Sequence, residues 1–254
     1  TLTSEKASKP YDGTALTKPH VTVTGDGFVT GEVSDIHATG SVTNVSEGEV
    51  TNTITFTEGA NYKASNYSIT KNEGKLSITA NDTEVTVTIT GNTDTKTYDG
   101  NKHSVEGYTV SISKPKLYQE NDITFTGSAK AEGTDANTYL MGLKVADFTN
   151  NNKNFTTVNF VVEDGKLVIN KRQVTLTSAS ASKKYDGTPL TKEVVTVDGE
   201  GFVAGEVSDI KATGSVTNVS EGEVTNAITF TKGDIFKDKN YEIAKNEGKL
   251  SIIA

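Results

Sequence analysis

The segment Glu84-Val85-Thr86-Val87-Thr88-Ile89-Thr90 decides the fold class of this 254-residue chain. Apolar and polar residues alternate along it, so that Val85, Val87 and Ile89 share one face, and this period of two predicts a half-buried β-strand. The same alternation recurs at Asn52, Ile54 and Phe56, at Leu76 and Ile78, and at Val158, Phe160 and Val162. Runs that favour helices are nearly absent, while Thr and other β-branched residues, which suit a pleated surface, are abundant. The sequence therefore predicts an all-β protein.

Outward from this segment, the chain repeats itself. A Tyr-Asp-Gly motif occurs three times with a constant step of 87 positions, at Tyr11, Asp12 and Gly13, at Tyr98, Asp99 and Gly100, and at Tyr185, Asp186 and Gly187. A closing motif follows each copy, Asn-Tyr or Asn-Phe and then Glu/Asp-Gly-Lys-Leu, beginning at Asn66, Asn154 and Asn240. Such internal periodicity is typical of tandem arrays.

The first and third copies resemble each other more than either resembles the second, since residues 42–52 reappear unchanged as residues 216–226. We define repeat 1 as residues 1–80, repeat 2 as 81–171 and repeat 3 as 172–254, and we call repeats 1 and 3 type A and repeat 2 type B. The alternation predicts three tandem small β modules.

Turn-forming residues separate the expected strands, and Asp-Gly supplies the positive φ of a tight turn. We expect six or seven strands per repeat, a hairpin joining residues 42–45 to 50–57, and a long loop over Gly25 to Ile36 that covers Phe28 and Val29. An immunoglobulin-like sandwich is the leading architecture and a β-grasp-like sheet is the alternative. Because the joints contain no flexible spacer, we expect an elongated rod.

Composition excludes several classes of function. A net charge of -8 and a pI near 5.0 argue against a nucleic-acid partner, because such binding requires Lys and Arg at phosphates, and they favour a chain that repels itself and stays monomeric. Without Cys there are no disulfides, thiolate metal sites or cysteine nucleophiles. No segment reaches the roughly 20 apolar residues needed to span a membrane, so we expect no membrane insertion.

Candidate sites are few. We interpret the Tyr-Asp-Gly motif as structural, with the Tyr ring packed at the pole of a module and Asp-Gly forming a turn. His20, His37 and His103 fall at unrelated positions of the repeat, and no Gly-x-Ser-x-Gly motif is present, so we predict no enzyme, no catalytic residues and no cofactor. One alternative is Ca²⁺ bound by acidic residues, for which the candidates are Asp26, Glu32, Asp35, Glu47 and Glu49.

The ordered pair of motifs, Lys-Pro-Tyr-Asp-Gly-Thr from Lys9 followed by Asn-Tyr-Ser-Ile and Glu-Gly-Lys-Leu-Ser-Ile, resembles the mostly-β, glycine-rich repeats of bacterial surface adhesins, of the MBG and YDG types. The resemblance covers all three copies. It implies an extracellular position on a bacterial surface, attached to the cell wall and typical of Gram-positive organisms, in a stalk or adhesive array. The family provides no catalytic residues to transfer.

Two functions remain open. In the first, the modules are a non-catalytic spacer that projects a binding domain from the cell. In the second, the modules themselves bind a host glycan or an extracellular-matrix protein, and the apolar residues of repeat 2 are the place to look: Leu117, Tyr118, Tyr139, Leu140, Met141 and Leu143.

Overall fold

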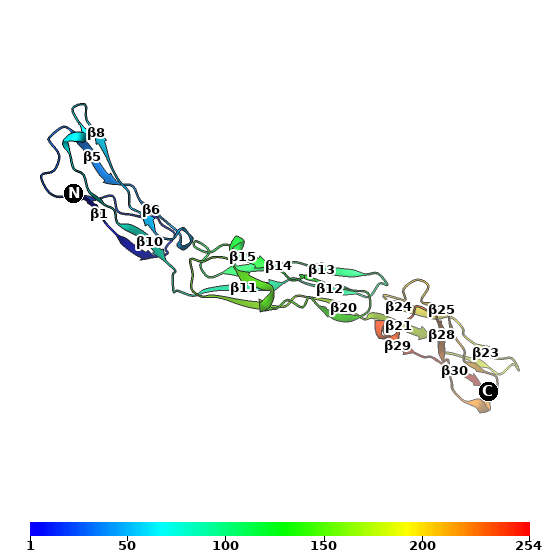
Figure 1. Ribbon diagram of the computed structural model, residues 1–254. Helices are drawn as coiled ribbons and strands as arrows, with labels where there is room; N and C mark the ends of the chain where they lie inside the picture. Colours follow the sequence, from blue (N-terminus) through cyan, green and yellow to red (C-terminus); the bar gives the residue numbers. More distant parts are fainter. The chain divides into compact units, whose positions relative to one another are not determined.

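The computed structural model describes every residue from Thr1 to Ala254 and confirms the all-β prediction. Its regular elements are short strands and 3-10 turns, with no α-helix, and no sheet closes into a barrel (Figure 1). No helix in the structure has the length and apolar character needed to cross a membrane.

Each repeat contains ten strands. Repeat 1 has β1 (Leu2–Ser4), β2 (Ala7–Pro10), β3 (Leu16–Thr17), β4 (Val21–Val23), β5 (Val33–Ala38), β6 (Ser41–Val42), β7 (Val50–Thr51), β8 (Ile54–Glu58), β9 (Lys71–Asn72) and β10 (Lys75–Thr79). Repeat 2 has β11 (Val85–Gly91), β12 (Thr93–Thr97), β13 (His103–Glu106), β14 (Tyr108–Ile112), β15 (Ile123–Phe125), β16 (Lys130–Gly133), β17 (Asn137–Leu140), β18 (Phe148–Asn150), β19 (Val158–Glu163) and β20 (Lys166–Asn170). Repeat 3 has β21 (Arg172–Ser178), β22 (Ala181–Lys184), β23 (Leu190–Thr191), β24 (Val195–Gly199), β25 (Val207–Ala212), β26 (Ser215–Val216), β27 (Val224–Thr225), β28 (Ile228–Lys232), β29 (Tyr241–Asn246) and β30 (Lys249–Ile253).

Six 3-10 turns connect these strands: η1 (Val45–Glu47), η2 (Ala64–Asn66), η3 (Glu120–Asp122), η4 (Val145–Asp147), η5 (Val219–Glu221) and η6 (Asp238–Asn240). By its contacts, the chain divides into two compact units. Unit 1 holds Thr1–Ile89, Val110–Gly127 and Lys144–Glu163, and unit 2 holds Thr90–Thr109, Ser128–Leu143 and Asp164–Ala254. Repeat 1 therefore shares a unit with part of repeat 2, and repeat 3 shares a unit with the other part. The division into three domains remains a prediction.

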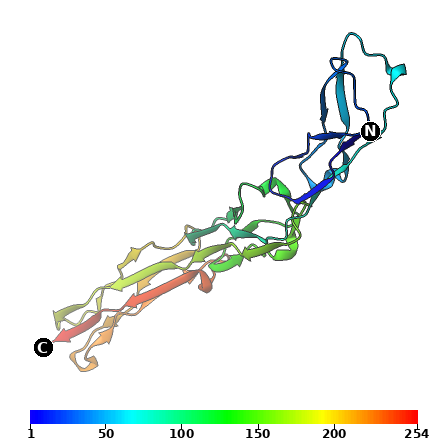
Figure 2. The same cartoon turned by 90° about the vertical axis from the view of Figure 1, so that its left-hand side faces the viewer.

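The sheets of the type A repeats are small and mixed. In repeat 1, β1 pairs antiparallel with β4 and parallel with β9, while β10 pairs parallel with β2 and antiparallel with β7. Two further antiparallel pairs, β3 with β6 and β5 with β8, complete the repeat, and β5 and β8 lie side by side in both views (Figures 1 and 2). Repeat 3 reproduces every one of these pairings.

The alternating segments bury the predicted faces. Val85, Val87 and Ile89 are fully buried in β11, and Leu76 and Ile78 are buried in β10. One buried core cluster of repeat 1 comprises Leu16, Val42, Leu76 and Ile78, and the matching cluster of repeat 3 comprises Leu190, Val216, Leu250 and Ile252. Each type A repeat also has an aromatic cluster, Phe28, Phe56, Tyr62 and Tyr67 in repeat 1 and Phe202, Phe230, Phe236 and Tyr241 in repeat 3.

In the type A repeats, buried polar side chains hold together backbone segments that are far apart in the sequence. The side chain of Asn52 is fully buried, accepts a hydrogen bond from the amide of Gly40, and donates to the carbonyls of Glu5 and Lys18. Gly74 approaches the backbone so closely that an added Cβ would lie 2.3 Å from the Glu5 carbonyl oxygen. The glycine of the closing motif is therefore required by packing.

Three local predictions were wrong. Residues 42–45 and 50–57 do not form a hairpin, because β6 pairs with β3 and β7 pairs with β10. The loop that begins at Gly25 ends before β5, so Ile36 lies in a strand, and Val29 is 62% exposed where burial was expected. The strands number ten per repeat, against the expected six or seven, because bends and turns divide the extended segments.

Candidate functional site

The Tyr-Asp-Gly motif of each type A repeat forms a turn closed by its carboxylate. Asp12 Oδ1 accepts hydrogen bonds from the backbone amide of Thr14 (2.9 Å), the Thr14 hydroxyl (2.7 Å) and Lys9 Nζ (2.8 Å). The Lys9 ammonium and the Thr14 donors hold the pKa of the Asp12 carboxyl far below its usual range. Lys183, Asp186 and Thr188 repeat this arrangement in repeat 3.

Repeat 2 closes the same turn with different partners. Asp99 Oδ1 accepts from the amide of Asn101 and from His103 Nε2, each at 2.9 Å. Gly100 has φ 82°, in the left-handed region that favours glycine. The third position of the motif thus has the positive φ that the sequence predicted for a turn.

In unit 1, the tyrosine of this turn contacts the following repeat. The Tyr11 ring packs edge-on against Phe155, with centroids 5.7 Å apart, and the Asn81 side chain donates to the Tyr11 carbonyl at 2.8 Å. Gly13 faces Leu117 so closely that an added Cβ would lie 2.7 Å from Leu117 Cδ2. The first Tyr-Asp-Gly turn is therefore part of the joint between repeats 1 and 2.

The closing motif of repeat 2 completes this joint. Asn154 is buried, its Oδ1 accepts from the backbone amide of Val45 at 2.8 Å, and its Nδ2 donates to Asn44 Oδ1 at 3.0 Å. Within repeat 2, the Asn81 amide donates to the Asn154 carbonyl at 2.8 Å and the Thr156 amide donates to the Asn81 carbonyl at 3.0 Å, which holds Asn81, the donor to Tyr11, beside the closing motif. Residues far apart in the sequence thus hold the joint at two points.

In unit 2, the tyrosine of the second Tyr-Asp-Gly turn makes a side-chain hydrogen bond to the following repeat, which the tyrosine of the first turn does not. Tyr98 is buried and its hydroxyl donates to Glu206 Oε1 at 2.5 Å, while the Tyr241 hydroxyl donates to Glu206 Oε2 at 2.7 Å. The two rings pack edge-on with centroids 5.6 Å apart. Burial, reinforced by the hydrogen bond to Glu206, raises the pKa of Tyr98 to about 12 and also raises that of Tyr241. Both phenols therefore remain donors to a carboxylate that is only 2% exposed.

The second point of this joint repeats the asparagine contact of the first. Asn240 is fully buried, its Oδ1 accepts from the amide of Ala136 at 2.8 Å, and its Nδ2 donates to Asp135 Oδ1 at 3.0 Å. Lys237 and Lys239 form ion pairs with the same carboxylate at 2.9 and 2.8 Å. Hydrogen bonds from Lys239, Asn240 and Lys237 hold the pKa of Asp135 well below its usual range.

Arg172, the one arginine of the chain, connects the two sides of this joint. Its Nη1 donates to the Tyr98 carbonyl at 3.2 Å, Nε donates to the Gly201 carbonyl at 2.7 Å, and Nη2 donates to the Glu200 carbonyl at 2.5 Å. Asn81 makes the matching contact to Tyr11 in unit 1. A fork of fixed donors thus binds three backbone carbonyls.

The third Tyr-Asp-Gly turn has no such partner. Tyr185 is 57% exposed, and an added Cβ on Gly187 would meet nothing within 4 Å. Tyr11 and Val45 pack on the core of repeat 1, whereas Tyr185 and Val219 are exposed. The motif was predicted at the pole of a module, but its partners Glu206, Asn154, Asn240 and Asp135 and the contacts of Arg172 were not predicted from the sequence. The asparagine of the closing motif was the one available signal.

The other candidates are dispersed. His20 and His37 lie beside acidic side chains on the surface, and no group of three or more His, Asp or Glu residues is arranged to hold a metal ion. Glu32 binds the Tyr67 hydroxyl and Glu47 binds the amides of residues 43 and 44. Of the apolar residues of repeat 2 considered for ligand binding, Tyr118, Met141 and Leu143 are buried and Leu140 is 64% exposed.

Comparisons with known proteins match residues 85–171, essentially repeat 2, to the MBG domain family. This agrees with the resemblance to MBG-type repeats found in the sequence. A solved structure of the I9–I11 tandem from titin is similar at 12% identity and a TM-score of 0.18, with 100% of this chain and 99% of that chain covered. No curated protein matches the chain.

Proposed function

We propose that these repeats are non-catalytic spacer modules of a bacterial cell-surface protein, which hold a binding domain away from the cell. The observation that carries the proposal is the pair of joints, each built from a Tyr-Asp-Gly turn and a buried asparagine of the closing motif. Such contacts between successive repeats restrict bending at the joint, which is what a spacer requires.

The composition and family match support the same function. MBG domains occur in surface proteins, and the matched segment is flanked by two similar repeats. A joint without Cys relies on polar and aromatic contacts, which persist in an oxidising or a reducing medium alike. We propose an extracellular, wall-attached position on a Gram-positive cell.

The test anchors the chain to a bead through Ala254 and carries a fluorescent domain ahead of Thr1, so that the height of the reporter above the surface can be measured. A flexible Gly/Ser chain of the same length, 254 residues, serves as the matched control, and its root-mean-square end-to-end distance is about 90 Å. We expect the repeats to hold the reporter higher than this control and with a narrower spread. A height equal to or below that of the flexible chain would contradict the proposal.

Joint stiffness can be measured separately because the chain lacks Cys. Spin labels on Glu58→Cys and Lys116→Cys report the distance distribution between repeats 1 and 2. We expect a narrow distribution that broadens when several Gly/Ser residues are inserted after Ala80. Saturable binding of the chain to a panel of host glycans or matrix proteins would instead favour the adhesive function.

A further inference from the structure

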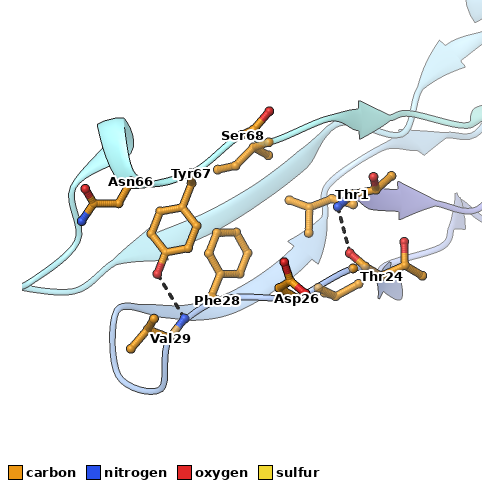
Figure 3. A pocket seen from close by; sticks show the side chains of 13 residues that line it. Thr1, Thr24, Asp26, Phe28, Val29, Asn66, Tyr67 and Ser68 are labelled. Carbon is orange, nitrogen blue, oxygen red and sulfur yellow. Dashed lines mark hydrogen bonds between the residues drawn. The ribbon is translucent and has the colours of Figure 1, made fainter.

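Repeat 1 has an open pocket at the end that carries Thr1. The pocket has a volume of about 520 Å³ and lies between β1, residues 23–29 and residues 66–69. Figure 3 shows Tyr67 and Phe28 side by side within it, with the Tyr67 hydroxyl bonded to the amide of Val29. Glu32 accepts a hydrogen bond from the same hydroxyl at 2.6 Å.

The corresponding surface of repeat 3 is covered. A shift of 174 positions converts Glu32 into Glu206 and Tyr67 into Tyr241, and there the second carboxylate oxygen accepts the hydrogen bond of Tyr98 from repeat 2. The carbonyls of Glu200 and Gly201, which correspond to Asp26 and Gly27, accept from Arg172. The two surfaces therefore have nearly the same residues but different occupancy.

At each of three compared positions, the residue of repeat 1 is more exposed to solvent than its counterpart in repeat 3. Val29 is 62% exposed, whereas Val203 is half-buried and lies 3.1 Å from where a Cβ on Gly100 would be. Asn66 is exposed and Asn240 is fully buried, while Glu32 is half-buried and Glu206 is 2% exposed. In repeat 3 the corresponding residues are covered by the end of repeat 2 that carries Tyr98 and Asp135 and that is followed directly by Arg172, the first residue of repeat 3. We call Tyr98, Asp135 and Arg172 together the exit end.

We propose that the pocket of repeat 1 is a docking surface for the exit end of a type B repeat, with a tyrosine equivalent to Tyr98 donating to Glu32. Asn66 then takes the place of Asn240 and binds the Asp-Ala pair equivalent to Asp135 and Ala136. The guanidinium equivalent to Arg172 binds the carbonyls of Asp26 and Gly27. This inference depends on the geometry of the joint in unit 2 and stands whether or not the repeats serve as a spacer.

Charge and hydrogen bonding favour a type B occupant over a type A occupant. Lys63 corresponds to Lys237, which pairs with Asp135, and type A repeats have Asn44 or Asn218 in the place of that aspartate in the equivalent contact. The Tyr11 hydroxyl makes no hydrogen bond in the joint of unit 1, where Phe155 replaces Tyr241. Glu32, which binds the Tyr67 hydroxyl beside the pocket, thus fits the donor that the type B exit end presents.

The test places a second copy of residues 1–174 directly ahead of Thr1, so that Val174 precedes Thr1 as it precedes Thr175 in the present chain. The added type B repeat keeps its own upstream neighbour. Hydrogen–deuterium exchange is followed in residues 25–32 and 64–69 of the original repeat 1. We expect exchange there to slow by about tenfold or more relative to the 254-residue chain.

Matched substitutions separate docking from general stabilisation. In the added copy, Tyr98→Phe removes the proposed donor to Glu32 and is expected to restore fast exchange in residues 25–32, whereas Tyr11→Phe removes a hydroxyl without a partner and is expected to change nothing. Strand 85–91 of the added copy is followed in the same experiment as its folding control. Unchanged exchange in residues 25–32 while that strand is protected would overturn the docking proposal and leave the spacer proposal intact.

Discussion

Tyr98 donates a hydrogen bond of 2.5 Å to Glu206, a residue 108 positions further along the chain. The carboxylate is buried and is satisfied by two phenols, one from each side of the joint. A buried carboxylate needs such donors, because charge removed from water without hydrogen bonds is costly. The stability of repeat 3 therefore depends on its contact with Tyr98 of repeat 2.

Replacing Tyr98 by Phe tests this dependence. The substitution keeps the ring contact with Tyr241 but leaves Glu206 Oε1 without its donor, so the free energy of unfolding of repeat 3 should fall by about 1–3 kcal/mol. Urea unfolding measures the change, and Tyr11→Phe is the control because its hydroxyl has no hydrogen-bond partner. Equal stability of Tyr98→Phe and the parent chain would show that the hydrogen bond contributes nothing to the fold.

We expect Asp135 to make the same joint sensitive to acid. Its carboxyl has a depressed pKa because it accepts hydrogen bonds from Lys239, Asn240 and Lys237. A group with a lowered pKa in the folded state contributes stability above its unfolded pKa of about 3.9, and this contribution is lost as pH falls below that value. We expect the free energy of unfolding of the parent chain to decline below about pH 4 more steeply than that of Asp135→Asn.

The control for this prediction is Asp186→Asn, which removes a carboxylate that is paired with Lys183 but largely exposed. Solvent screens such surface pairs, so this variant should show nearly the same decline below about pH 4 as the parent chain. If Asp135→Asn shows the same pH profile as the parent chain, the ion pairs at the joint do not contribute to its stability.

Local patterns were sufficient to predict strands but not their partners. The alternation around Val85 and Val87 depends on neighbouring residues alone, and those side chains are fully buried as expected. The hairpin prediction for residues 42–57 failed because β6 and β7 each pair with a strand remote in sequence. Pairing over such separations depends on the packing of the whole repeat, which periodicity does not encode.

At the joints too, the sequence was sufficient to locate the turns but not to predict what they contact. Internal repetition predicted turns at Tyr11, Tyr98 and Tyr185. The three motifs are identical, but their surroundings differ. The first tyrosine packs on Phe155, the second binds Glu206 and the third is exposed. The difference resides in the neighbouring repeat and not in the motif. Comparison of the motif with itself could therefore not distinguish a docked turn from an open one.

Asn154 and Asn66 occupy the same position of the closing motif and should respond differently to substitution. Asn154→Ala removes the acceptor of the Val45 amide in a buried setting, so we expect a loss of about 1–3 kcal/mol in the free energy of unfolding of unit 1. Asn66 is exposed, and its replacement by Ala should change stability by less than about 0.5 kcal/mol. Thermal unfolding of the two variants in parallel measures the difference, and similar losses at both positions would assign the asparagine a role within its own repeat.

Arg172 offers a test of geometry apart from charge. Lys at this position keeps the positive charge but replaces a planar fork, which reaches the carbonyls of Tyr98, Glu200 and Gly201, by a single ammonium on a flexible stem. At least one of these carbonyls then loses its partner in the joint, so Arg172→Lys should lower the free energy of unfolding by about 1–2 kcal/mol. Lys171→Arg is the matched control, since the neighbouring side chain is exposed. Hydrogen–deuterium exchange in residues 199–203 should accelerate in Arg172→Lys alone, and unchanged exchange in that segment would mean that the fork does not hold the joint.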